Sequence, residues 1–201
     1  MKTKRSTTMR CALAGAALIT GLFSSHLRAQ TDHTHNLAAM RAAPASEQKA
    51  QAGEFVRLVR ESTERFKDVA VAEAEGYHLL FGCVSGPDVG AMGLHYVNLA
   101  LVGDGELDAA RPKIVIYEPL PDGRLKLTGA DYLVLADAWH ARHANPPELM
   151  GQLFHLFESP NRFGLPTFYT LHVWAWKDSP TGTFVNWNRD VRCDAHNGPN
   201  K

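Results

Sequence analysis

The chain has 201 residues, 45 % of them hydrophobic, and its 21 basic and 21 acidic side chains give a formal net charge of zero. This composition is ordinary for a globular protein and argues against a disordered chain. Beyond the N-terminus, no run of Lys or Arg could follow a phosphate backbone or an anionic membrane surface. Nucleic acid and lipid surfaces are therefore disfavoured as partners.

Residues 1–29 have the three parts of a signal peptide. The first ten residues include four Lys or Arg and no acid, residues 11–23 are mostly apolar, and Ala29 is a small residue at the expected cleavage point. The apolar run is shorter than the about 20 residues that span a membrane, so we expect cleavage and no integral membrane segment in the mature chain. Cleavage removes five bases and no acid, leaving 16 bases against 21 acids. The sequence thus predicts an exported, mildly acidic protein, periplasmic or secreted.

The mature chain is expected to begin with a flexible leader and a long helix. Residues 30–45 are polar, rich in Ala and without periodicity, which predicts a leader before a single domain at 46–201. Apolar residues then recur with the three-and-four spacing of a helix, and Gly76 can end it. We expect one amphipathic helix over about residues 47–74.

After this helix the pattern changes to that of strands. A Pro-Asp-Gly turn at 119–123 predicts a hairpin, and residues 136–158 are expected to form a helical insertion with a short helix from Pro146 through His155. The order predicts an α+β fold: a long N-terminal amphipathic helix packed on an antiparallel sheet, with a helical insertion before the last strand. The expected strands are 77–84, 94–101, 113–118, 124–135 and 167–176.

Two cysteines, Cys83 and Cys193, remain after the signal peptide. Paired thiols form disulfides in an oxidising compartment outside the cytoplasm. We therefore predict a Cys83–Cys193 disulfide, which would tie the C-terminal tail to the middle of the domain. Two metal-binding thiolates are the alternative, but no CxxC spacing supports them.

Three histidines, His95, His155 and His172, lie among apolar neighbours. Strand alternation gives His95 and His172 definite faces, and Glu118 shares a face with two isoleucines of its own strand. If these faces line one concavity, two imidazoles and a carboxylate converge, which suits a divalent metal such as zinc, iron or copper. His155 could add a ligand, and Glu118 could act as ligand or catalytic base. Alternatively, the histidines are hydrogen-bonded in the core and Glu118 forms an ion pair, for example with Arg124.

The last third of the chain is rich in aromatic rings, including Trp174, Trp176 and Trp187. If these rings are exposed together, they can stack on a sugar or another planar ligand, and if buried they belong to the core. The first case defines a second hypothesis, a non-catalytic binding module for a small-molecule ligand. A structural envelope protein is the third.

Four segments of the chain carry a resemblance when taken together. They are MGLHYVN (92–98), KIVIYEP (113–119), NRFGLPTFY (161–169) and LHVWAWKDSPTGTFVNWN (171–188). In combination they resemble an uncharacterised family of exported bacterial proteins over about residues 50–193. The resemblance implies the exported α+β domain, but no activity.

The leading functional hypothesis therefore comes from the histidines. It is a divalent-metal site, in a metal-dependent enzyme for a small substrate if the metal keeps an open position.

Overall fold

The computed structural model describes residues 45–199. Helices and a six-stranded antiparallel sheet make up this part of the chain, which confirms the α+β class. The expected signal peptide and nearly all of the expected leader lie outside it. Within it, no helix is long and apolar enough to cross a membrane. The helices are α2 (Ala45–Thr63), α3 (Val69–Ala74), α4 (Leu99–Asp104) and α5 (Ala136–His140), and the strands are β1 (His78–Gly86), β2 (Gly90–Val97), β3 (Ile114–Pro119), β4 (Leu125–Leu135), β5 (Glu148–Leu149), β6 (Gln152–Leu153), β7 (His155–Phe157) and β8 (Phe168–Val173).

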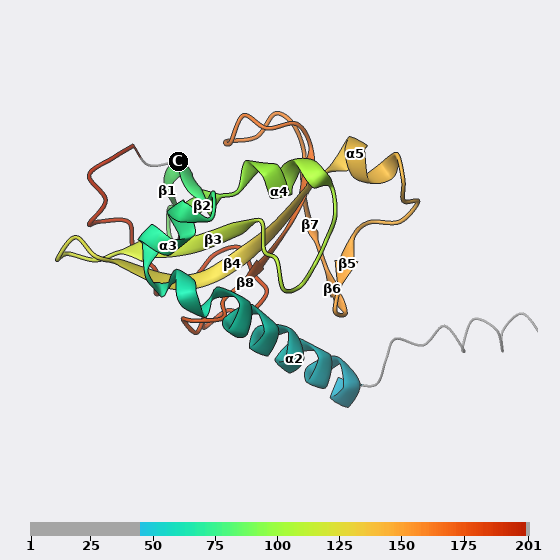
Figure 1. Cartoon of the computed structure of the whole chain (residues 1–201), viewed down its shortest axis with the longest axis horizontal. Coiled ribbons are helices and arrows are strands. Elements are labelled where there is room, and N and C mark those ends of the chain that lie inside the picture. Colours follow the sequence, from blue (N-terminus) through green and yellow to red (C-terminus); the bar gives the residue numbers. More distant parts are fainter. Residues whose placement is uncertain (1–44, 200–201) are drawn as a thin grey trace, which may run out of the picture. The chain divides into compact units, whose positions relative to one another are not determined.

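The main sheet has the spatial order β1-β2-β3-β4-β8-β7, and every neighbouring pair is antiparallel. Strands β1 to β4 form a meander in which each strand lies beside the next one along the chain (Figure 1). The predicted hairpin is the β3-β4 pair, closed by a hydrogen bond from the Gly123 amide to the Leu120 carbonyl at 2.9 Å. β5 and β6 form a separate two-stranded ladder.

The N-terminal helix is interrupted where the sequence pattern predicted continuity. α2 ends at Thr63, and a 3₁₀ turn at Glu64–Lys67 separates it from α3. Asp68 has an extended backbone, and its side chain caps α3 by accepting a hydrogen bond from the Ala70 amide at 3.0 Å. Because a short acidic side chain competes well for exposed amides at a helix start, a new helix begins here. The prediction of a single helix over 47–74 is therefore wrong.

The segment between β4 and β8 is helical only in α5. The expected short helix from Pro146 through His155 is absent from this segment, which instead holds β5, β6 and β7. β7 pairs with β8, with His155 opposite Thr170. This pairing satisfies backbone groups of β8 that a helix at this position would leave without a partner.

Strand alternation gives the sheet two faces with separate apolar clusters. On one face Phe55 of α2 packs against Tyr132 and Leu171, and α2 runs along that side of the sheet (Figure 1). On the other face Leu133 and Phe168 belong to a second cluster. Successive residues of a strand point to opposite sides. The neighbours of Tyr132 and Leu171 along β4 and β8 are therefore turned away from α2.

The C-terminal segment after β8 is fastened to the sheet at several points. Cys193 forms a disulfide with Cys83 of β1, and their Cα atoms are 5.7 Å apart, which confirms the predicted pairing. Asn188 forms an isolated bridge with Ala91 of β2. The backbone amide of Arg192 donates to the carboxylate of Glu118 on β3 at 3.0 Å. The segment thus passes from β8 to β1 and contacts the strands between them.

Gly93, in β2, has a left-handed backbone with φ of 96°, and a Cβ added there would lie 2.6 Å from the carbonyl oxygen of Tyr117. We expect Gly93→Ala to lower the free energy of unfolding by about 2 kcal/mol or more, since both the backbone strain and the clash cost energy. Gly53→Ala in α2 is the matched control. No atom lies within 4 Å of the added methyl group, so this change should stabilise the helix by up to about 1 kcal/mol. Urea unfolding measures both, and a loss below about 0.5 kcal/mol in Gly93→Ala would contradict the expectation.

Candidate functional site

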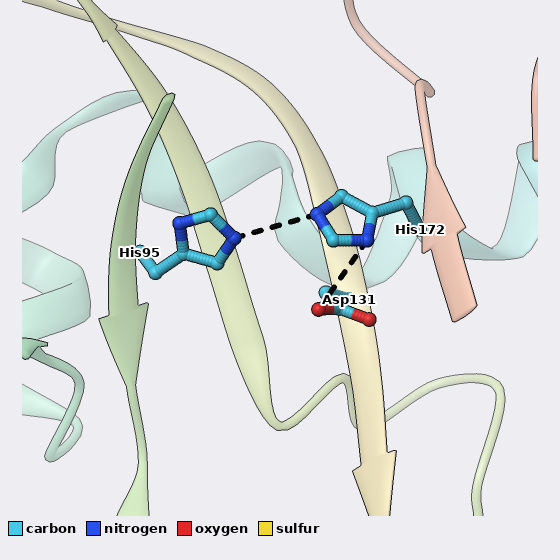
Figure 2. Close-up of side chains that lie close together, drawn as sticks. All are labelled: His95, Asp131 and His172. Atoms are coloured by element: carbon cyan, nitrogen blue, oxygen red, sulfur yellow. Dashed lines mark hydrogen bonds and ion pairs between the residues drawn. The ribbon is translucent and has the colours of Figure 1, made fainter. Parts of the chain in front are cut away.

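Three ionisable side chains from three strands meet on the face turned away from α2: His95 from β2, Asp131 from β4 and His172 from β8 (Figure 2). The strand register brings them together. Asp131 and His172 are direct partners in the β4-β8 ladder. Between β2 and β4, β3 pairs Ile116 with His95 and Ile114 with Asp131. All three side chains are buried, with exposed fractions of 4 %, 2 % and 2 %.

The carboxylate of Asp131 is held in place by its neighbours on β8. Its Oδ1 atom accepts hydrogen bonds from the Thr170 hydroxyl at 2.6 Å and from the Leu171 amide at 3.2 Å. Its Oδ2 atom lies 3.5 Å from Nδ1 of His172. That nitrogen is buried and makes no hydrogen bond within residues 45–199. The carboxylate is therefore aimed at an imidazole whose Nδ1 is unsatisfied.

The two imidazoles face each other through their Nε2 atoms, which are 3.4 Å apart. The ring planes are inclined by 72°. Nδ1 of His95 lies 3.1 Å from the carbonyl oxygen of Gly93. Because a carbonyl oxygen only accepts hydrogen bonds, neutral His95 carries its proton on Nδ1. Its Nε2 lone pair then points at His172.

Burial decides the protonation states of His95, Asp131 and His172, which are called the cluster below. Desolvation, reinforced by the nearby His172, lowers the pKa of His95 to about 4. Desolvation, reinforced by His155 and partly opposed by the side chain of Asn186, lowers the pKa of His172 to about 3. Desolvation raises the pKa of Asp131 to about 6, although the hydrogen bond from Thr170 opposes this shift. At neutral pH the site therefore consists of two neutral imidazoles and one ionised carboxylate.

These three groups could hold a metal ion. One candidate ligand atom from each of His95, Asp131 and His172 lies within 4.8 Å of the other two. Neutral imidazole nitrogen and carboxylate oxygen are common ligands of zinc, iron and copper in proteins. A metal binds the deprotonated forms, which are the forms present here at neutral pH.

The cluster borders a small cavity with apolar walls. The cavity has a volume of about 20 Å³, which is enough for about one water molecule. Two of its rings, Phe81 and Phe163, are in edge contact with centroids 5.4 Å apart. Apart from the cluster and Thr170, the lining side chains are Phe81, Met92, Ile114, Leu133, Phe157, Phe163, Leu165 and Phe168.

Glu118 lies apart from this cluster, although sequence alternation put it on the same face. His95 is opposite Ile116, and Glu118 lies two residues further along β3, on the side away from Asp131. Its carboxylate accepts hydrogen bonds from Nζ of Lys177 at 2.7 Å and from the Arg192 amide at 3.0 Å. The carboxylate near the two histidines is therefore that of Asp131, and the prediction that Glu118 joins them is wrong.

His155 is also outside the cluster. It lies on β7 at the edge of the sheet, and its side chain is exposed. Its Nε2 atom is 3.3 Å from the carbonyl oxygen of Phe184. The prediction that His155 adds a ligand gains no support from this position.

The three tryptophans lie in different surroundings. Trp174 is 3 % exposed, and its indole nitrogen donates to the carbonyl of Val185 at 2.6 Å. Trp176 is partly buried, and its indole nitrogen donates to the Thr63 hydroxyl at 3.0 Å. Trp187 lies near the guanidinium of Arg162, 5.6 Å from the ring centroid. These positions do not favour a common groove for a planar ligand.

Asp131 is the site residue that sequence reasoning missed. It is the lone acid in β4, whose sequence LKLTGADYLVL is otherwise largely apolar. A buried acid requires compensating partners, so its position in an apolar strand was the available signal. Its partner could not be read from the sequence, because the pairing of β4 with β8 joins segments about 40 residues apart.

Similarity to other proteins does not point to a function. Comparisons of the chain with protein-family models, with curated proteins and with solved structures found no match.

Proposed function

We propose that this protein is an exported metal-binding domain in which the Nε2 atoms of His95 and His172 bind one divalent transition-metal ion. The observation that carries the proposal is the 3.4 Å separation of these two atoms. Zinc binds imidazole nitrogen at about 2.0–2.1 Å, so two ligands at a tetrahedral angle lie about 3.3–3.4 Å apart. The imidazoles are thus spaced as ligands of one ion.

The proton positions support a cation between the rings. If His172 carries its proton on Nδ1, two bare Nε2 lone pairs face each other at 3.4 Å. If the proton is on Nε2, the bare Nδ1 faces the ionised Asp131 carboxylate at 3.5 Å. Each neutral form therefore leaves one unfavourable contact. A metal ion on both Nε2 atoms allows both Nδ1 atoms to remain protonated.

The acceptors for those two protons are already in place. The Gly93 carbonyl is 3.1 Å from Nδ1 of His95, and Oδ2 of Asp131 is 3.5 Å from Nδ1 of His172. Histidines that bind metals almost always donate their other N–H to a carbonyl or carboxylate, which fixes the ring and its tautomer. Asp131 also supplies a negative charge that offsets part of the charge of the ion.

The chemistry that follows is activation of a small molecule by the metal. Two imidazole ligands, with the Asp131 carboxylate behind His172, suit zinc, iron or copper and leave coordination positions open. An ion held by these residues would lie beside the cavity and would supply Lewis-acid activation of a bound water or substrate, as in a metal-dependent enzyme. We assign Glu118 to anchoring the C-terminal segment and not to this chemistry. The signal-like N-terminus, the disulfide and the resemblance to an exported family support a periplasmic or secreted location.

Metal analysis of protein purified without an affinity tag tests the proposal. The wild type should contain or take up close to one equivalent of zinc, iron or copper, and His95→Ala and His172→Ala should each hold less than about a tenth of that. Asp131→Asn keeps an acceptor for the His172 proton and should weaken binding by about 10- to 100-fold. His155→Ala is the control and should bind as the wild type does. Folded wild-type protein that takes up none of the three metals would refute the proposal, with circular dichroism confirming that each variant is folded.

A further inference from the structure

The cavity beside the cluster has almost no polar group to offer a ligand. Four phenylalanines form much of its wall: Phe81, Phe157, Phe163 and Phe168. Among the described residues that line it, the Thr170 hydroxyl is the one polar side-chain group outside the cluster, and it already donates to Asp131 at 2.6 Å. A ligand in this cavity would therefore make its polar contacts to the metal and its other contacts to hydrocarbon.

This lining discriminates against charged ligands. No Lys or Arg side chain is among the described residues that line the cavity. An anion entering it would lose its hydration without gaining hydrogen-bond donors, which is costly in an apolar environment. Asp131 offsets one of the two charges of a divalent ion, which reduces the attraction that the ion exerts on an anion. An uncharged ligand does not meet the desolvation penalty.

The size of the cavity is equally restrictive. Its volume of about 20 Å³ lies between that of one and two water-sized spheres, which leaves room for a single molecule of at most two or three heavy atoms. The ring of Phe163 restricts it further, with centroids 5.4 Å from Phe81 and 5.9 Å from both Phe157 and Phe168. Phe163 lies in the connection between β7 and β8 and is partly exposed. It therefore stands at the boundary between the cavity and the surface.

We infer that the substrate or co-substrate bound at the open metal position is a small, uncharged molecule of two or three heavy atoms, of the class of dioxygen or nitric oxide, and not an anion such as a phosphate or carboxylate. The inference rests on the proposed metal site and specifies what that site accepts. Affinity comes from the metal, and selectivity comes from the apolar wall and from Phe163.

Nitric oxide and azide are small metal ligands of which only azide is charged. Because Fe²⁺ binds nitric oxide more tightly than azide in any surroundings, azide binding is compared between the wild type and Phe163→Ala, whose cavity is more open to solvent. The full-length mature protein is loaded with Fe²⁺ under nitrogen, its iron content is measured, and each probe is titrated while absorbance and electron paramagnetic resonance are recorded. We expect one equivalent of nitric oxide to bind to both proteins, and azide to bind at least about tenfold more weakly to the wild type than to Phe163→Ala. Iron-loaded wild type that binds azide as tightly as Phe163→Ala does, or that binds no nitric oxide, overturns the inference and leaves the metal site standing. Protein that retains no Fe²⁺, Zn²⁺ or Cu²⁺ overturns the metal site itself.

A size series tests the role of Phe163. Methyl and tert-butyl isocyanide are neutral ligands that differ in bulk, and the wild type should exclude the larger one. Phe163→Ala should bind tert-butyl isocyanide at least about tenfold more tightly than the wild type while keeping its iron content. Leu153→Ala, at a side chain that is 66 % exposed and outside the cavity, is the matched control and should behave as the wild type does. Equal binding of tert-butyl isocyanide by the wild type and Phe163→Ala would show that Phe163 does not limit the size of the ligand.

Discussion

Removing the Cys83–Cys193 disulfide is expected to lower the free energy of unfolding by about 4 to 5 kcal/mol. The two cysteines are 110 residues apart in the sequence, and in the chain-entropy model a cross-link over about 100 residues restricts the unfolded chain by about 4.7 kcal/mol. That is a large part of the 5 to 15 kcal/mol that stabilises a typical domain. The C-terminal segment should detach from β1 and β2 first, because the disulfide fixes its end.

The Cys83→Ala, Cys193→Ala double variant measures this effect by urea unfolding. Alanine is the appropriate replacement, since Cys83 is fully buried and a serine would bury an unpaired hydroxyl there. Wild-type protein reduced with a thiol provides the control and should match the double variant. A stability loss below about 1 kcal/mol in both would show that the noncovalent contacts of the C-terminal segment suffice.

Acidification should lower the free energy of unfolding of the metal-free protein, and Asp131 should make this decrease smaller. Unfolded histidines titrate near 6.5, whereas burial lowers the pKa of His95 to about 4 and that of His172 to about 3. The unfolded chain therefore gains two protons below pH 6.5 that the folded chain does not, and stability is lost as the pH falls. Asp131 acts in the opposite direction, because its pKa is raised from 3.8 to about 6. Its protonated form favours the folded state, so its contribution grows as the pH falls from 6 toward 4.

From pH 6 to 4 the unfolded state thus binds about one proton more than the folded state at these three groups. The expected slope is about 1.4 kcal/mol per pH unit. In Asp131→Asn the folded-state proton is absent, and the slope should rise to about 2.3 kcal/mol per pH unit. Urea unfolding of both proteins in chelator at several pH values gives the two slopes. Other titrating groups are common to both, so parallel curves would contradict the assigned pKa of Asp131.

The sequence predicted the parts of the fold that depend on local patterns. The β3-β4 hairpin followed from a Pro-Asp-Gly turn between two apolar runs, and the disulfide followed from two cysteines and the expectation that the chain is exported. The break at Asp68 was missed, because the apolar spacing continues across it while its side chain caps a new helix. In place of the helix expected from Pro146, the chain forms the short β5-β6 ladder and then the pairing of β7 with β8. The second of these contacts joins segments that local sequence does not bring together.

The site shows the same division between local and distant information. Side-chain alternation within β2 and β8 led to the prediction that His95 and His172 converge, and the two side chains do meet. Alternation alone could not state how far along β3 the cluster lies, so Glu118 was chosen although the cluster is level with Ile114 and Ile116. Asp131 was missed because its role depends on register between β4 and β8.

The order of the strands places the three cluster residues on inner strands and part of the cavity wall on the outer strands of the sheet. The cluster residues come from β2, β4 and β8, which are inner strands paired on both sides, whereas Phe81 and Phe157 come from the outer strands β1 and β7. Outer strands open locally at low cost, and here they carry side chains such as Leu80 and Leu156 that are 46 % and 49 % exposed. Fraying of an edge can therefore admit a small molecule without disturbing the ligand geometry. Amide hydrogens of β1 and β7 should exchange with solvent sooner than those of β4.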